Sequence, residues 1–161
     1  MAHLSGDRNT LLLGIACFLM GMIVMVLVLH LVPLPEKQVI FTKKAPSPIG
    51  PYSQAVYFDN LVYTSGQVGI DPETGNLSST GNGQTAQVMK NLQGILGESG
   101  LDFSDVVMTR IYLTNMTDYG AVNEMYAEYM GNSSPARSTV QVAGLPRGAM
   151  VEIEMIAQDR S

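Results

Sequence analysis

The sequence predicts a two-layer α+β domain, with one sheet carrying two helices on one face, preceded by a single transmembrane helix. Three observations lead to this prediction. An uncharged apolar run lies near the N-terminus, several short segments alternate apolar and polar residues, and two stretches repeat apolar residues at helical spacing. A chain of 161 residues accommodates one domain of ordinary size and a short additional segment. Two layers around a single core are a common arrangement for such elements.

Residues 11–32 are expected to form the transmembrane helix. No Asp, Glu, Lys or Arg lies between Leu11 and Pro35. A helix over this run would span about 33 Å, against about 30 Å of bilayer hydrocarbon. A cleaved signal peptide is the alternative, but its apolar core is usually about 7–15 residues long and ends at a small-x-small site, which residues 31–35 lack.

The flanking segments suggest an orientation for this helix. Residues 1–10 form an N-terminal flank with Arg8, whereas Lys37, Lys43 and Lys44 follow the apolar run and the linker of residues 33–38. Because positive charges favour the cytoplasmic side, we expect a single-pass membrane protein whose domain is cytoplasmic.

Alternation and turn residues predict six strands in the domain of residues 39–161. The expected strands cover residues 39–42, 52–58, 61–65, 106–113, 137–142 and 150–157. Asp59-Asn60 is expected to form a hairpin turn. The element order is then β-β-β-α-β-α-β-β, which fits one sheet with two helices laid on the same face.

Two segments have helical periodicity. In the first, Val88, Leu92, Ile95 and Leu96 share one face, and Gly97 and Gly100 are expected to end the helix. In the second, Thr117 or Asp118 is the expected N-cap. Its apolar face consists of Val122, Met125, Tyr126, Tyr129 and Met130.

The composition excludes several chemistries. Both histidines, His3 and His30, and the single cysteine, Cys17, precede the domain. The domain therefore has no Ser-His-Asp or Cys-His nucleophile and lacks the usual ligands of zinc or iron. From Val39 onward twelve acidic residues face seven basic ones, a net charge of −5, which argues against nucleic acid as a partner.

Arg137 and Glu152 are the polar residues that the strand patterns place best for chemistry. Alternation puts Arg137 and Thr139 on one face of their strand, where a guanidinium beside a hydroxyl could hold a small carboxylate. Glu152 and Glu154 share the polar face of the last strand, where one carboxylate could position a water or move a proton. A solvated strand face is the alternative for both patterns, and by pattern alone it is the commoner one.

Other candidates are less specific. Ser65-Gly66 ends a strand, and a glycine there lets a ligand approach the backbone. Tyr52 follows Gly50-Pro51 and could belong to the core or to a pocket. Asn123 and Tyr126 are neighbours on a helix, and pattern alone makes Tyr126 a core residue.

Taken in order, the motifs of residues 40–157 resemble those of the Rid (YjgF) family of imine and enamine deaminases. The matching motifs are Ala45-Pro-x-x-Ile-Gly-Pro-Tyr-Ser-Gln-Ala-Val56, Tyr63-Thr-Ser-Gly-Gln67, Asp71-Pro-x-Thr-Gly75, Gln84-Thr-x-Gln87, Asn91-Leu92, Val122-Asn-x-x-Tyr126, Pro135-Ala-Arg-Ser-Thr-Val-Gln-Val142, Leu145-Pro146 and Val151-Glu-Ile-Glu154.

The resemblance implies a chorismate-mutase-like fold and a homotrimer with sites between subunits. It implies hydrolysis of 2-imino and 2-enamino acids, such as 2-aminoacrylate, to 2-keto acids and ammonia, with no metal or organic cofactor. Arg137 matches the arginine that binds the substrate carboxylate, and Glu152 the glutamate that positions water and moves a proton. The other matching pocket positions are Tyr52, Ser65, Gly66, Asn123, Tyr126 and Thr139; at Thr139 some members have cysteine.

Two other functions stay open at this point. Relatives of the family are also credited with RNA cleavage that inhibits translation, against which the negative charge and the missing histidines argue. The domain could also bind keto acids without turnover, as a sensor or a chaperone-like module at a membrane. The N-terminal helix departs from the family pattern, because typical members are soluble.

Overall fold

The computed structural model describes residues 5–31 and 35–160 and divides the chain into two units, residues 1–35 and 36–161. The first unit holds helix α1 (Ser5–Leu31), which begins six residues before the predicted Leu11. Within α1, Arg8–Leu27 has a mean hydropathy of 2.6 and is long and apolar enough to cross a membrane. The predicted helix end at Val32, residues 33–34 of the predicted linker and residues 1–4 of the predicted flank lie outside the described residues.

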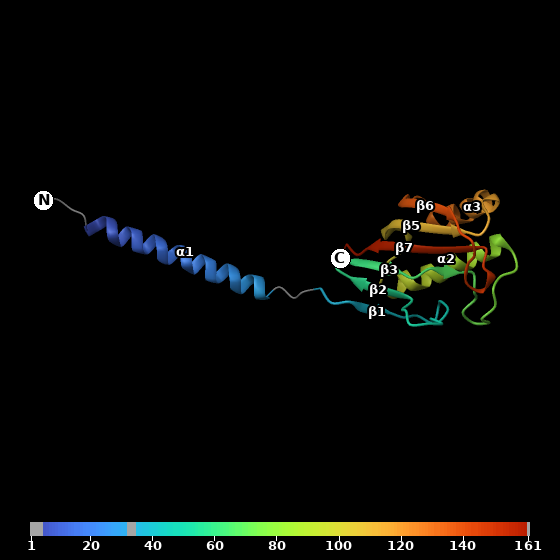
Figure 1. Cartoon of the computed structure of the whole chain (residues 1–161), viewed down its shortest axis with the longest axis horizontal. Helices are drawn as coiled ribbons and strands as arrows, with labels where there is room; N and C mark the ends of the chain where they lie inside the picture. Colours follow the sequence, from blue (N-terminus) through green and yellow to red (C-terminus); the bar gives the residue numbers. More distant parts are fainter. Residues whose placement is uncertain (1–4, 32–34, 161) are drawn as a thin grey trace. The chain divides into compact units, whose positions relative to one another are not determined.

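The second unit is built on one mixed sheet (Figure 1). Its strands are β1 (Gln38–Ile40), β2 (Ala55–Phe58), β3 (Leu61–Thr64), β4 (Gln67–Val68), β5 (Val106–Leu113), β6 (Ala136–Gln141) and β7 (Val151–Gln158). The spatial order is β1-β2-β3-β7-β5-β6, and β4 also pairs with β7. Only β5 and β6 run parallel among these pairs, because helix α3 (Tyr119–Met130) connects them as a crossover.

The β2–β3 hairpin turns where the sequence predicts. Asp59 and Asn60 have φ values of 51° and 60°, the left-handed conformation that a two-residue turn of the favoured type requires at both positions. Asn and Asp tolerate this conformation better than other residues with side chains.

The sequence did not predict strand β4, because two residues are too few to display an alternation. β3 and β4 both pair with β7, with Tyr63 opposite Ile156 and Gln67 opposite Ile153. The ladder is open between them, at Ser65-Gly66. There the hydroxyl of Thr64 accepts a hydrogen bond from the Met155 amide at 2.9 Å. This opening gives the domain a recess beside β7.

Helix α2 (Gly81–Glu98) and α3 cover one face of the sheet (Figure 1). Thr80 caps α2 by accepting a hydrogen bond from the Gly83 amide at 3.1 Å. Asp118, one of the two predicted caps, is the N-cap residue of α3 but makes no side-chain cap hydrogen bond to it. Asn115 caps the preceding 3₁₀ turn, Met116–Asp118. The buried core joins the two helices to the sheet and includes Val88, Leu92, Ile95, Val122, Met130, Ile153 and Met155.

Strand pairing determines which side chains share a face. In β7, Val151, Ile153, Met155 and Ala157 are buried, and Glu152 and Glu154 point to the opposite, open face. Met155 pairs with Thr109, and Thr109 pairs with Arg137. Because paired residues point to the same side of a sheet, Arg137 lies on the helix side and Glu152 on the open side.

Candidate active site

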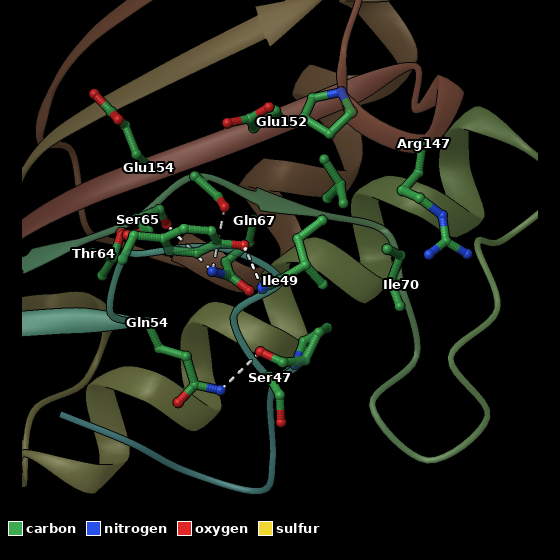
Figure 2. Close-up of a pocket in the computed structure, with 15 residues that line it drawn as sticks. Ser47, Ile49, Gln54, Thr64, Ser65, Gln67, Ile70, Arg147, Glu152 and Glu154 are labelled. Carbon is green, nitrogen blue, oxygen red and sulfur yellow. Dashed lines mark hydrogen bonds between the residues drawn. The ribbon is translucent and has the colours of Figure 1, made fainter.

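A cavity of about 530 Å³ lies beside the opening between β3 and β4 (Figure 2). Four of the predicted site residues line it: Tyr52, Ser65, Gly66 and Glu152. The rest of its wall is partly apolar and includes Pro46, Ile49, Val68, Ile70 and Pro146. A concave, mostly apolar recess with a few convergent polar groups is the usual form of a small-molecule site.

Buried hydrogen bonds hold the loop that forms one side of this cavity. The side-chain amide of Gln54, which is 1% exposed, donates to the carbonyl oxygens of Thr42, Ala45 and Pro46 at 2.9–3.0 Å. Its oxygen accepts from the Thr42 amide at 2.7 Å. Gln54 therefore fixes the proline-rich loop that carries Tyr52, whose hydroxyl accepts a 3.3 Å hydrogen bond from the Ile49 amide.

Ser65 and Gly66 form the floor of the cavity next to Glu152. The Ser65 hydroxyl donates to the Ser53 carbonyl at 2.6 Å, which leaves its oxygen lone pairs for another donor. A β-carbon at Gly66 would collide with the carboxylate of Glu152. The absence of a side chain at this position is therefore what allows Glu152 to lie against the backbone.

Glu152 is a carboxylate with a perturbed proton affinity. Its pKa is raised above the usual value, first because burial disfavours the charged form and second because Glu154 carries a like charge. A raised carboxyl pKa in a cavity is a common property of groups that exchange protons during catalysis.

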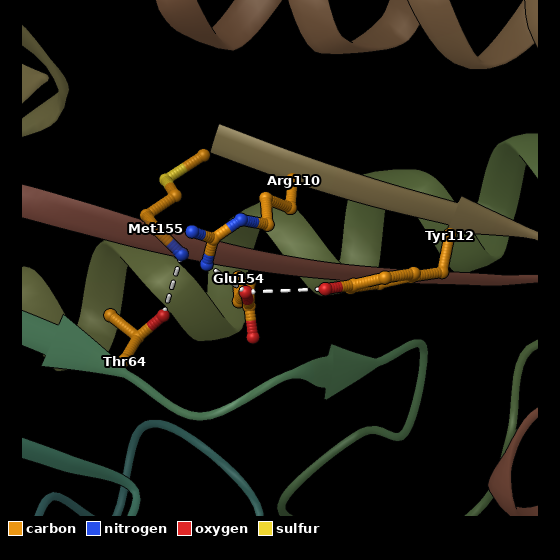
Figure 3. A network of polar contacts seen from close by, with 5 residues as sticks. All are labelled: Thr64, Arg110, Tyr112, Glu154 and Met155. Carbon is orange, nitrogen blue, oxygen red and sulfur yellow. Dashed lines mark hydrogen bonds and ion pairs between the residues drawn. The ribbon is translucent and has the colours of Figure 1, made fainter. Parts of the chain in front are cut away.

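Glu154 belongs to a polar network on the open face (Figure 3). Its Oε1 forms an ion pair with Nη1 of Arg110 at 2.6 Å and accepts a hydrogen bond from the Tyr112 hydroxyl at 3.2 Å. Burial and the neighbouring Glu154 raise the pKa of Tyr112, so this phenol stays protonated and can donate. The network fixes the second carboxylate beside Glu152.

Arg137 lies in a separate cluster on the helix side of the sheet. Its guanidinium carbon is 5.0 Å from the centroid of the Tyr126 ring, a cation–π distance, and its Nη2 donates to the Tyr119 hydroxyl at 3.3 Å. Tyr126 is 5% exposed and its hydroxyl shares a 3.0 Å hydrogen bond with Thr109. Burial raises the pKa of Tyr126. The arginine is thus oriented by aromatic groups rather than paired with an acid.

The predicted site residues therefore fall into two groups within one chain. Tyr52, Ser65, Gly66 and Glu152 meet in the cavity. Arg137, Thr139, Asn123 and Tyr126 lie on β6 and α3, with Arg137 and Thr139 on the helix side of the sheet. Tyr126 belongs to the core, as its pattern predicted, and also supports Arg137.

Residue patterns alone do not single out several residues at these sites. Arg110 and Tyr112 fall within a predicted strand that carries no assigned role, and Gln54 belongs to a motif without one. Arg147 lines the cavity, but no local pattern marks it. Cross-strand alternation could have placed Arg110 and Tyr112 on one face, but not opposite Glu154 and Glu152, because that needs the register. Among the described residues, no cluster of three His, Cys, Asp or Glu side chains is arranged to hold a metal.

The chain matches a protein-family model described as Endoribonuclease L-PSP over residues 42–159. It is 53% identical over 122 residues to the 2-iminobutanoate/2-iminopropanoate deaminase of Mus musculus, covering 75% of this chain and 90% of that protein. The chain belongs to the Rid family. The family predicted from the resemblance is thereby confirmed, and so is its fold of a mixed sheet with helices.

Solved structures of Rid-family proteins share this fold. A putative endoribonuclease from Thermotoga maritima has a TM-score of 0.76 and 46% identity, covering 78% of this chain and all of that one. E. coli TdcF with bound serine has a TM-score of 0.74 and 35% identity, and the match covers 77% of this chain and 99% of that one. The matched region is the domain, so α1 is an addition to a complete Rid unit.

Proposed function

We propose that this chain is a 2-iminobutanoate/2-iminopropanoate deaminase, which hydrolyses reactive 2-imino and 2-enamino acids, such as 2-aminoacrylate, to 2-keto acids and ammonia. The main support is Glu152, a carboxylate with a raised pKa that lies against Gly66 and lines a cavity. The 53% identity to a mouse protein named for this activity supports the same reaction. The reaction needs no metal and no organic cofactor.

The chemistry requires little more than orientation and one proton carrier. A protonated imine carbon is already electrophilic, so a water oxygen held by Glu152 can add to it while the carboxylate takes the water proton. Glu152 then returns that proton to the nitrogen. As the C–N bond breaks and the C=O bond forms, the ionised Glu152 takes the remaining hydroxyl proton and passes it to the departing ammonia, which leaves as ammonium. An enamine enters this route after tautomerising to the imine.

The proposed carboxylate clamp is Arg137, with Thr139 beside it on the same strand face. Arg137 and Glu152 point to opposite faces of one sheet, so a single chain cannot direct both at one small substrate. We therefore propose that the enzyme is a homotrimer and that each site joins Glu152, Tyr52, Ser65 and Gly66 of one subunit to Arg137, Thr139, Asn123 and Tyr126 of a neighbour. The exposed Val140, Tyr63 and Arg110 on the open face would then be covered by assembly.

Replacing Arg137 by Ala tests the proposed activity. Loss of one partner of a charge-assisted pair costs about 2–5 kcal/mol, so we expect kcat/KM for 2-aminoacrylate generated in situ to fall by about 100-fold. Arg160→Ala, which removes an exposed arginine outside the cavity, is the control and should leave the rate unchanged. Equal rates for wild type and Arg137→Ala would refute the proposal.

The same preparations separate the alternatives. Keto acids that bind with no turnover by the wild type would indicate a non-catalytic binding module. RNA degradation that survives exhaustive purification and disappears in the Glu152→Gln variant would indicate the RNA-cleaving function instead. No contact among the described residues favours either alternative.

We further propose that α1 anchors the enzyme to a membrane as a single pass, with its domain in the cytoplasm. The apolar segment Arg8–Leu27 motivates this proposal. In cell fractions, the full chain should sediment with membranes and be released by detergent but not by high salt or carbonate, whereas a chain starting at Glu36 should stay in the supernatant. A full chain found only in the supernatant, or without its first residues, would exclude a retained anchor.

A further inference from the structure

Arg147 adopts a backbone conformation that long side chains seldom adopt. Its φ and ψ are 59° and 15°, in the left-handed region, and Gly148 follows with a φ of 71°. Glycine or asparagine is the ordinary residue for such a position. Because non-glycine residues held in this region are often found at functional sites, the conformation of Arg147 leads us to ask what its side chain does.

The turn that carries Arg147 is anchored on both sides. The Gly148 amide donates to the Leu145 carbonyl at 3.2 Å, and the Ala149 amide donates to the Pro146 carbonyl at 3.1 Å. Ala149 is buried, and the next amide, that of Met150, donates to the buried side chain of Gln84 at 2.8 Å. The fold therefore fixes the point from which the Arg147 side chain starts.

Arg147 lines the same cavity as Glu152 and Ser65. Figure 2 shows Arg147 and Glu154 on opposite sides of the drawn set of residues, so the guanidinium of Arg147 gives one end of the cavity a positive charge. Among the described residues, Arg110 forms the salt bridge with Glu154 and Arg147 forms none, so the guanidinium of Arg147 is not paired with an acid. An arginine in this situation is suited to bind a carboxylate with two parallel hydrogen bonds.

The cavity is larger than a three- or four-carbon imino acid needs. Its volume of about 530 Å³ lies within the range of about 300–1,000 Å³ that is typical of sites for larger ligands. Ile49, Val68 and Ile70 contribute an apolar wall to it. A substrate whose imine carbon lies at Glu152 could therefore extend an aliphatic chain along this wall toward Arg147.

We propose that Arg147 binds a second carboxylate, at the far end of the substrate's side chain, so that the pocket accepts dicarboxylic 2-imino acids. This inference rests on the proposed deaminase function and names a substrate class for it. Arg147 takes no part in making or breaking bonds. It selects among substrates by holding an anionic group at a distance from the reacting carbon.

Binding of two keto acids to the full chain in detergent tests this assignment. The probes are 2-oxoglutarate and 2-oxopentanoate, which share a five-carbon chain and differ in the terminal carboxylate. The variant is Arg147→Gln, which removes the charge and, like the wild type, places a non-glycine residue in the left-handed conformation at this position. Arg160→Gln is the matched control. By calorimetry, Arg147→Gln should lower the affinity for 2-oxoglutarate about tenfold and change the affinity for 2-oxopentanoate less than about twofold. Arg160→Gln should change neither affinity.

Two results would overturn the inference. One is an unchanged affinity of Arg147→Gln for 2-oxoglutarate. The other is an equal loss for both keto acids, which would make Arg147 part of the common carboxylate clamp. A wild type that binds both keto acids but does not accelerate imine hydrolysis would refute the deaminase function. The ratio of the two affinities would still show whether Arg147 binds the second carboxylate.

Discussion

At the scale of single residues, the pKa of Glu152 depends partly on Glu154, two positions along β7. Burial raises the pKa of Glu152, and the charge of Glu154 raises it further. Arg110 and Tyr112 hold Glu154 in place from the adjacent strand β5. In the proposed reaction Glu152 accepts a proton from water, so its affinity for that proton depends in part on Glu154.

Glu154→Gln should lower the pKa of Glu152. The substitution removes the like charge of Glu154, one of the two causes of the raised pKa, and this favours the ionised form of Glu152. If the ionised carboxylate is the active form, the acid limb of the kcat/KM profile moves to lower pH. Carboxyl NMR titration of Glu152 checks the shift directly.

The exposed Glu128 on α3 supplies the control, since Glu128→Gln should leave the acid limb unmoved. An acid limb that moves to higher pH in Glu154→Gln, or does not move, would contradict this explanation.

The raised pKa of Glu152 also predicts how the free energy of unfolding changes with pH. A carboxyl whose folded pKa is raised favours the fold most at low pH and loses that contribution as the pH rises through the folded pKa, so Glu152→Gln should stabilise the protein relative to wild type above that pKa.

At the scale of elements, two nearby glycines have different purposes. A β-carbon at Gly66 would meet the end of the Glu152 side chain, which can move aside. A β-carbon at Gly69 would lie 2.5 Å from the Cα atom of Gln84 in α2, which cannot move without shifting the helix. The first glycine serves the site and the second lets α2 pack closely on the sheet.

These differences predict opposite outcomes for two alanine substitutions. Gly66→Ala should reduce kcat strongly and change the melting temperature little, because only the Glu152 side chain is displaced. Gly69→Ala should destabilise the fold by about 1–3 kcal/mol, the usual cost of overfilling a close contact. Gly97→Ala is the control, since no atom lies within 4 Å of its β-carbon position in α2 and the change should stabilise slightly. Thermal unfolding and steady-state kinetics on the same samples separate these results.

Local residue patterns predict most helices and strands, but they predict less of how the strands pair. The Asp59-Asn60 turn, the span of β5 and the buried face of β7 follow from local residue types, so they could be predicted. The position of Arg137 opposite Thr109 could not be, because the register of a parallel pair depends on how the crossover helix α3 packs. The conformation of Arg147 could not be predicted either, since it contradicts the preference of its own side chain.

At the scale of the whole molecule, the proposed site requires residues from both sides of the sheet. Glu152 opens into the cavity on one side of the sheet, and Arg137 rests on Tyr126 on the other. β6, which carries Arg137, is the edge strand of the sheet, so its residues are accessible to a neighbouring copy. Assembly would therefore be a condition for catalysis rather than an aid to stability.

Mixing two inactive variants is the most direct measurement of this claim. Arg137→Ala and Glu152→Gln are each purified, combined in equal amounts, dissociated and reassembled, and then assayed with 2-aminoacrylate. If each site takes its arginine and its glutamate from different subunits, random assembly creates intact sites at about a quarter of the positions, and about a quarter of the wild-type rate should return. If both residues act within one chain, no intact site can form, and activity that stays at the level of the separate variants would contradict the account.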